Sequence, residues 1–182
     1  GSSAASDVYK RQVVVMANGA LASQELVTVA TEVRSPQRSI VTLPTSSMVQ
    51  CLAALAVHDP GEQADADAYA MAEAAAGTRW GSLQLADQKM MTLAGMCDVG
   101  DVLGLIGSDV LVVAPDQTAA ATALVDLMLA TGGEMVTVLA GGEVDPAALD
   151  AITEQMRRSH PGIELAVYET GQCGDLIEVG VE

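Results

Sequence analysis

The sequence is poor in aromatic and in basic residues, and each shortage excludes a class of protein. It contains no Phe, one Trp and three Tyr, although half of its 182 residues are apolar. The core must therefore be aliphatic, built from Val, Leu, Ile, Met and Ala. Eight Lys and Arg stand against twenty-four Asp and Glu, and the formal charge of −16 would repel a nucleic acid backbone or an anionic membrane surface. A basic patch on a protein partner would be attracted instead.

Long apolar runs and paired cysteines are also lacking. No apolar stretch approaches the roughly 20 residues of a membrane span, because acidic residues interrupt the longest ones. No basic segment leads into a long apolar stretch near the N-terminus, so we expect no signal peptide. The cysteines are odd in number and widely spaced, which disfavours a disulfide framework and favours a reducing cytoplasm. They are Cys51, Cys97 and Cys173.

The last quarter of the chain carries the clearest secondary-structure pattern. Residues 135–139 are apolar and β-branched, as in a strand covered on both faces. Asp145-Pro146 predicts a helix start, as cap and first residue, and Pro161-Gly162 predicts its end. Apolar and polar residues then alternate over 163–168, and 176–181 is again strand-like. The pattern predicts a β-α-β unit followed by one further strand.

The residues before this unit should supply its sheet neighbours. A strand is expected at 80–85, with 90–93 as its partner, and a hairpin is expected over 102–113. Asp116 predicts the cap of the following helix. Residues 78–182 therefore predict an α/β lobe with the element order β-β-α-β-α-β-β.

Residues 13–64 predict a second, parallel α/β lobe. A buried-type strand at 13–16 and a strand at 39–43 are each followed by a turn and an apolar helix, the second helix covering 49–57. Two strand-turn-helix units in succession favour a parallel sheet. The chain is thus expected to be a two-lobed α/β protein.

Two further segments complete the expected domain organisation. Residues 65–77 form an alanine-rich pattern that predicts a helix connecting the lobes, with Gly77 as its cap. Residues 1–12 start with small polar side chains and are expected to be a tag or a disordered tail.

Small polar residues follow three of the expected strands, where α/β lobes place ligands. These candidate contact residues are Asn18, Thr45, Ser46, Ser47, Gly171 and Gln172. Thr45-Ser46-Ser47 begins a helix whose amides and dipole could bind a phosphate or carboxylate, or one hydroxyl could simply cap that helix. Gly171-Gln172 could face a cleft or serve only as a turn. The chain lacks the GxxxxGK[ST] pattern, so no nucleotide site is predicted.

The remaining polar residues suggest no metal or catalytic site. Zinc sites usually draw ligands from close pairs, and the cysteines and histidines form none. Cys51, on an apolar helix, is expected to be an inert small hydrophobe. Asp65 and Asp67 suit the N-terminus of a helix, and 62–67 is expected to be a solvated face. The residues by themselves thus predict no catalytic constellation and no cofactor.

Several runs, taken in order, resemble one known domain. They are 39–55, 99–106, 136–144 and Gly171-Gln172, together with the terminal Val181-Glu182. The set resembles the C-terminal domain of the YloV type of dihydroxyacetone-kinase-like protein, the large subunit of bacterial fatty-acid kinase, which is similar in fold to DegV-like fatty-acid-binding proteins. The first strand and helix of that family would precede Val13, so the resemblance implies a DegV-like fold with a truncated first lobe.

The resemblance also implies a division of labour. A separate N-terminal kinase domain of the same polypeptide would bind ATP and metal. The present domain would dock a fatty-acid-binding protein subunit, whose fatty acid is phosphorylated on its carboxylate, and would itself carry out no chemistry. Two alternatives stay open. One is a stand-alone DegV-like lipid or small-molecule binding module, and the other is a free-standing enzyme, which would need His58 or His160 beside a cysteine or carboxylate in a cleft.

Overall fold

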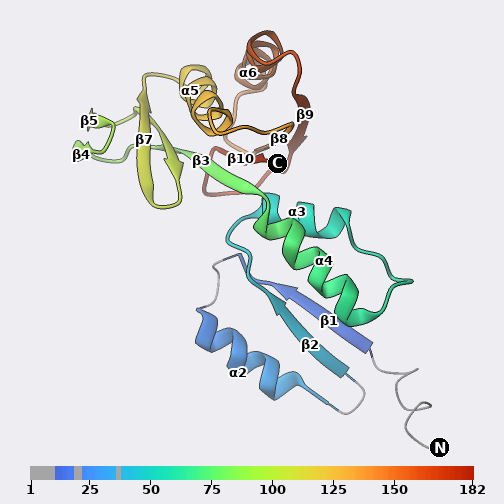
Figure 1. The fold of residues 1–182 in the computed structure, drawn as a ribbon. Helices are drawn as coiled ribbons and strands as arrows, with labels where there is room; N and C mark the ends of the chain where they lie inside the picture. Colours follow the sequence, from blue (N-terminus) through green and yellow to red (C-terminus); the bar gives the residue numbers. More distant parts are fainter. Residues whose placement is uncertain (1–10, 19–21, 36–37) are drawn as a thin grey trace, which may run out of the picture. The chain divides into compact units, whose positions relative to one another are not determined.

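The computed structural model describes residues 11–18, 22–35 and 38–182 of the chain. These residues fall into two compact units, residues 1–77 and residues 78–182 (Figure 1). The first strand begins at Arg11, so Arg11 and Gln12 belong to the strand and not to the tail predicted over 1–12. The rest of that predicted tail lies outside the described residues. Among the described helices, none has the length and apolar content needed to cross a membrane.

The first unit is built on a two-stranded parallel sheet. Strands β1 (Arg11–Met16) and β2 (Arg38–Leu43) pair in parallel, with Val13 opposite Ile40. Helix α2 (Ser23–Val33) lies on one side of the strands and α4 (Ala64–Ala76) on the other, after the short helix α3 (Met48–Ala56) (Figure 1). The parallel pairing confirms the prediction from the repeated strand-turn-helix pattern. The core of this unit is small and aliphatic, and its buried members are Leu43, Ala54, Met71 and Ala75.

The second unit is built on a six-stranded mixed sheet. Its strands are β3 (Arg79–Leu85), β6 (Val102–Ile106), β7 (Asp109–Ala114), β8 (Met135–Ala140), β9 (Glu164–Glu169) and β10 (Ile177–Val181). Their order across the sheet is β7-β6-β3-β10-β8-β9. Only β8 and β9 pair in parallel, which confirms the predicted β-α-β unit, and the other pairs are antiparallel. The last strand thus lies in the middle of the sheet.

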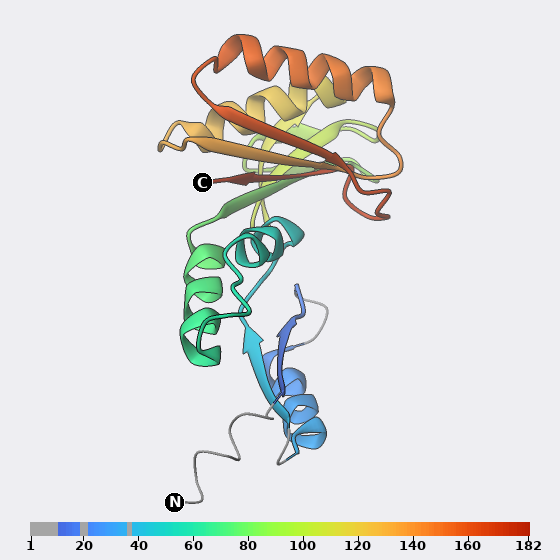
Figure 2. The same cartoon turned by 90° about the vertical axis from the view of Figure 1, so that its right-hand side faces the viewer.

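Two helices cover one face of this sheet. Helix α5 (Gln117–Leu129) and helix α6 (Pro146–Ser159) lie side by side over it (Figure 2). Each begins as predicted, because Asp116 accepts a hydrogen bond from the Ala119 amide and Asp145 accepts one from the Ala147 amide. The largest hydrophobic core of the described residues lies between these helices and the sheet.

Two glycines bring α5 close to the sheet. A Cβ atom on Gly81 of β3 would lie 3.3 Å from Leu124 Cδ2, and a Cβ atom on Gly104 of β6 would lie 3.6 Å from Leu124 Cβ. Gly81 and Gly104 are on neighbouring antiparallel strands. The missing side chains therefore leave space that the fully buried Leu124 fills.

A small hairpin corrects one prediction about strand pairing. Strand β4 (Met90–Thr92) was expected to pair with β3, but it pairs with β5 (Gly95–Cys97), a strand that the sequence did not predict. Strand β3 pairs instead with β6 and β10. The sheet of the second unit consequently begins with three strands before α5, and the predicted order β-β-α-β-α-β-β omitted β3.

Candidate functional site

The ends of β1 and β2 bring together two of the predicted contact residues. Because parallel strands end at the same edge of a sheet, Asn18 after β1 and Thr45 after β2 lie close to each other. The Cys51 thiol, on α3, donates a hydrogen bond to Asn18 Oδ1 at 2.8 Å and lies 3.7 Å from Thr45 Oγ1. Asn18 adopts a left-handed backbone conformation, with φ of 52°, which asparagine tolerates better than most residues. These three side chains form one polar group, here called the strand-end cluster.

The hydroxyl groups next to this cluster cap helix α3. Ser47 is the N-cap residue, and its side chain accepts a hydrogen bond from the Gln50 amide at 3.3 Å. The Gln50 side chain accepts in turn from the Ser46 amide at 2.7 Å. The predicted alternative that one hydroxyl caps the helix is therefore confirmed for Ser47. Thr45 and Ser47 are buried, whereas Ser46 is exposed.

Gly171 and Gln172 belong to the second unit, in the connection between β9 and β10. Gly171 has a φ of 67°, and the carbonyl oxygen of Gln172 accepts a hydrogen bond from the Gly142 amide at 2.9 Å. The Gln172 amide donates to Thr170 Oγ1, and the Gln172 side chain is exposed. The main chain of Gly171-Gln172 thus holds the connection against Gly141-Gly142, which favours the turn reading over a cleft reading.

Cys51 was the residue of the strand-end cluster that the sequence did not identify as a candidate. It is buried, at 4% exposure, as expected for a small hydrophobe on an apolar helix. Its thiol is nevertheless a hydrogen-bond donor to a strand-end amide that lies 33 positions earlier in the chain. Helical spacing from Ser47 places Cys51 one turn into α3, and this was the available signal.

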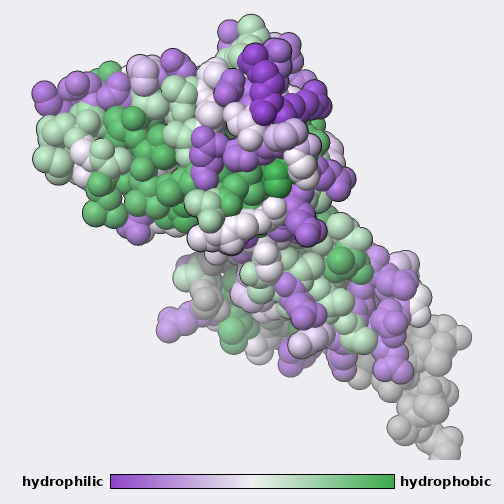
Figure 3. All heavy atoms as spheres, turned by 45° about the horizontal axis from the view of Figure 1, so that its top comes forward, coloured by the Kyte–Doolittle hydropathy of each residue, from purple (hydrophilic) through white to green (hydrophobic). Residues whose placement is uncertain are grey.

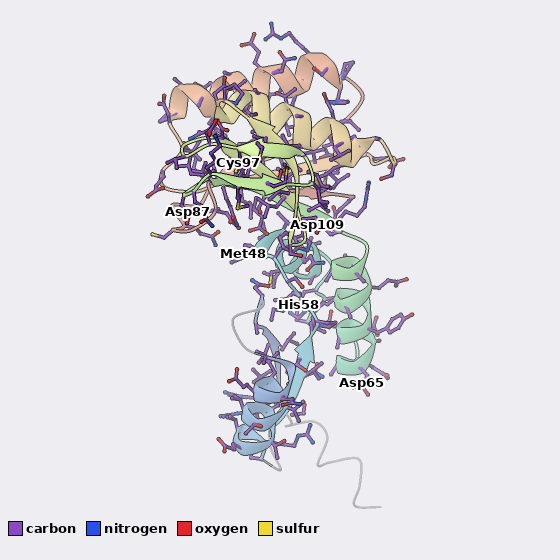
Figure 4. The ribbon with its side chains drawn as sticks, turned by 90° about the vertical axis from the view of Figure 1, so that its left-hand side faces the viewer. Met48, His58, Asp65, Asp87, Cys97 and Asp109 are labelled. Atoms are coloured by element: carbon purple, nitrogen blue, oxygen red, sulfur yellow. The ribbon has the colours of Figure 1, made fainter. Side chains whose placement is uncertain are left out.

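Asp67 corrects the prediction of a solvated acidic face over 62–67. Its carboxylate is buried, at 5% exposure, and accepts a hydrogen bond from the Asp59 amide at 2.8 Å. The other carboxylate oxygen lies 2.7 Å from Nδ1 of His58, which precedes α4 in the loop after α3 (Figure 4). The hydrogen bond from the Asp59 amide is the main reason that the pKa of Asp67 is lowered, and His58 adds to the effect against the opposing cost of burial. Asp67 therefore ties the α3–α4 loop to α4.

The lowered pKa of Asp67 predicts an acid-sensitive loop. A carboxylate whose pKa is lower in the folded than in the unfolded state, where it is about 3.9, stabilises the fold above that value and loses this effect as pH falls through the folded-state pKa. We expect Asp67→Asn to speed hydrogen exchange of the Asp59 amide at pH 7. The difference from the unmodified chain should shrink as the pH is lowered below about 4.

The matched control for this prediction is Asp65→Asn, two positions earlier in the first turn of α4 and exposed (Figure 4). It should leave exchange of the Asp59 amide almost unchanged. Equal effects of the two substitutions would contradict the role given to Asp67.

The second histidine also pairs with a carboxylate. His160 Nε2, at the end of α6, lies 2.6 Å from Asp126 Oδ1 on α5. Both histidines thus meet the carboxylate that the hypothesis of a free-standing enzyme required, but each pair fastens one segment of a unit to another. Within the described residues, no group of three or more His, Cys, Asp or Glu side chains is arranged to hold a metal ion.

His160 also borders a small apolar cavity of the second unit. The cavity lies under α5 and α6 and has a volume of about 10 Å³. Its lining includes Val125, Met156, Ile163 and Leu165. This volume is close to the minimum for one water molecule, so the cavity is far too small for an acyl chain.

The chain was compared with known proteins by sequence. Over residues 2–182 it matches the family of FakA-like C-terminal domains, which belong to fatty acid kinase. An uncharacterized protein of Staphylococcus aureus strain USA300 is 29% identical over 134 residues, which is 72% of this chain and 24% of that protein. The related protein of strain COL has the same identity and coverage. The chain thus spans about a quarter of the length of the curated relatives that it matches.

Solved structures share the fold at low sequence identity. The dihydroxyacetone kinase from C. freundii, in complex with AMP-PNP and Mg²⁺, has a TM-score of 0.65 at 15% identity, over 95% of this chain and 38% of that one. The Streptococcus pneumoniae fatty acid kinase B3 protein, loaded with linoleic acid, has a TM-score of 0.62 at 12% identity, over 96% and 72%. A DegV family protein from Eubacterium eligens, loaded with heptadecanoic acid, has a TM-score of 0.60 at 10% identity, over 96% and 74%.

These likenesses confirm the mixed α/β, DegV-like fold expected from the sequence. The sequence match covers nearly all of the chain, and it identifies the same family that the ordered runs suggested. The chain belongs to the family of FakA-like C-terminal domains of fatty acid kinase.

Proposed function

We propose that this chain is the non-catalytic C-terminal domain of a fatty-acid kinase-like protein and that it docks a fatty-acid-binding partner. The observation that carries the proposal is the family match over residues 2–182. The relatives are about four times longer than the matched segment, which leaves room in such polypeptides for a separate kinase domain. The net charge of −16 suits a protein partner with a basic surface.

The proposal assigns phosphoryl transfer to the ATP-binding domain of the longer polypeptide. A magnesium–nucleotide site needs carboxylate or other oxygen ligands gathered around one point. The described residues offer no such group of three or more acidic or metal-ligating side chains, so they do not fit that cofactor. We therefore derive no chemical step through this chain and assign it recognition alone.

Binding between purified proteins tests the proposal. Each DegV-family fatty-acid-binding protein encoded in the source genome would be loaded with linoleic acid and titrated with the 182-residue chain at low salt by calorimetry. We expect one of them to form a stoichiometric complex that weakens as salt is raised, because the acidic chain is attracted to a basic surface. If none of them binds at low salt, the proposal is wrong.

A stand-alone lipid-binding or small-molecule-binding module is the second candidate. The observation that favours it is the pair of buried hydroxyl groups, Thr45 and Ser47, at the N-terminus of α3, where a carboxylate would be stabilised. The similar DegV family protein from Eubacterium eligens was solved with heptadecanoic acid. Native mass spectrometry of the gently purified chain should then show an added acyl mass, and Thr45→Val should remove it while the exposed Ser46→Ala should not. A chain that carries no fatty acid and takes none up would exclude this candidate.

A further inference from the structure

One segment of the second unit is not needed to connect the strands that flank it. Strands β3 and β6 are antiparallel neighbours, which a two-residue turn can join. The chain instead makes an excursion over residues 87–100, closed at its base by hydrogen bonds from the Ala86 amide to the Asp101 carbonyl at 2.8 Å and from the Gly100 amide to the Ala86 carbonyl at 2.9 Å. The excursion contains the hairpin β4–β5, and Figure 4 marks Asp87 and Cys97 near its two ends.

The hairpin is apolar on both of its faces. Met90 and Cys97 are paired on the inner face, where they pack with Leu103 and Ala86 in a small core. Met91 and Met96 are paired on the outer face, where they are 71% and 50% exposed. A hairpin that served only to cover the sheet would be expected to carry polar residues on its outer face.

The tip of the hairpin holds a further apolar side chain in a fixed place. Leu93 lies in the turn between the two strands and is 75% exposed. The Thr92 hydroxyl donates to the Gly95 carbonyl at 2.7 Å and accepts from the Ala94 amide at 3.1 Å, so the turn is closed by its own hydrogen bonds. A preorganised apolar side chain loses little entropy on binding.

These residues form a continuous feature that we call the hairpin patch. Its members are Leu85, Met91, Leu93, Met96 and Val99, each at least half exposed. Figure 3 shows apolar side chains gathered over the left part of this unit, where β4, β5 and β7 lie. Exposed apolar clusters of this kind mark interaction surfaces, and methionine adapts well to the shape of a partner.

The charges around the hairpin patch define what can cover it. Residues 78–182 contain sixteen acidic and only four basic side chains. Lys89, the basic residue within the excursion, lies 3.5 Å from Asp98 and is partly neutralised by it. Asp87 and Asp101 leave the rim acidic. A second copy of this acidic chain and an anionic lipid surface are both disfavoured, whereas a protein rimmed by Lys and Arg is attracted.

We propose that the hairpin patch is the docking surface of this domain and that its occupant is an apolar pocket rimmed by Lys and Arg on the fatty-acid-binding partner. This inference rests on the proposed function and names the element that performs it. Leu93 and Met91 enter the pocket, and Asp87 faces the basic rim. The apolar contacts set the lifetime of the complex, and the acidic rim speeds its formation.

The test compares hairpin variants with matched surface variants in the titration described above, with the same loaded partner. Met91→Ser/Leu93→Ser is expected to weaken binding by at least about tenfold. The control Tyr168→Ser, which removes an exposed aromatic side chain from β9 of the same unit, should bind as the unmodified chain does. Asp87→Lys should slow association and flatten its salt dependence, while Asp150→Lys on α6 should change either one less. Thermal unfolding should be nearly equal for all four variants, because each altered side chain is exposed.

The outcomes separate this inference from the function on which it rests. If the unmodified chain binds no loaded partner, the proposed function fails. If the unmodified chain and Met91→Ser/Leu93→Ser bind equally well, the domain docks through another surface and the inference alone is wrong. If sedimentation shows that the free chain self-associates and that Met91→Ser/Leu93→Ser abolishes this association, the patch is an interface between copies, which also overturns the inference.

Discussion

Replacing Gly141 by alanine is expected to lower the free energy of unfolding of the second unit by about 3 kcal/mol. A Cβ atom at this position would lie 2.7 Å from the Asp175 carbonyl oxygen and 3.0 Å from that of Gln172. Both are main-chain atoms, so the clash cannot be relieved by a side-chain rotation. The Gly141 amide also donates to the Leu176 carbonyl at 2.8 Å, which fixes the position of the strand end. The β9–β10 connection would have to move away from β8.

Denaturant unfolding followed by the fluorescence of Trp80, the single tryptophan, measures this change. Gly162→Ala is the matched control, because a Cβ atom on Gly162 would have no neighbour within 4 Å. It should change the free energy of unfolding by less than about 0.5 kcal/mol. Faster amide exchange over 171–176 in Gly141→Ala alone would locate the damage. Equal stability of the two variants would show that the connection does not depend on the close approach at Gly141.

Leu124→Ala is expected to be comparably damaging, at about 3 to 4 kcal/mol. Leu124 is fully buried on α5 and fills the space over Gly81 and Gly104. Since both neighbours lack side chains and belong to a hydrogen-bonded sheet, the strands cannot collapse into the cavity that alanine would leave. Poor relaxation places the cost in the upper part of the range for such substitutions.

Leu127, on the same helix, provides the control for this prediction because it is 42% exposed. Leu127→Ala should lower the free energy of unfolding by less than about 1 kcal/mol, by the same Trp80 measurement. A cost of less than about 1.5 kcal/mol for Leu124→Ala would mean that α5 settles onto the sheet after the substitution. Amide exchange in β3 and β6 should then slow rather than quicken.

Much of the secondary structure could be predicted from local signals. The caps Asp116 and Asp145 start α5 and α6, and the apolar alternation before them and after them marks β7 and β9. These predictions succeeded because a cap or a two-residue alternation is decided by atoms within one or two turns of chain. The pairing of β4 with β5 rather than β3 was missed because β5 is only three residues long, too short for any period to be seen.

The candidate site was predicted less completely, because its contacts are long-range. Asn18 and Thr45 could be proposed from their places after strands, and parallel pairing brings them together. The bond from Cys51 to Asn18 depends on the packing of α3 beside the sheet edge, and helical spacing predicts only which face Cys51 shares. Asp67 was assigned to a solvated face because acidic runs usually are, but the loop that returns over it supplies the Asp59 amide and His58.

The sequence by itself determined the aliphatic core, the acidic surface, the parallel pair of the first unit and the family, since these depend on composition, on periodicity and on runs of residues in order. Only the tertiary structure decided that the C-terminal strand β10 lies between β3 and β8, that Gly81 and Gly104 admit Leu124, and that the outer face of the β4–β5 hairpin is apolar. The physical reason is that register and burial are set by which distant segments meet. That choice is made by the packing of the whole unit, and no stretch of sequence states it locally.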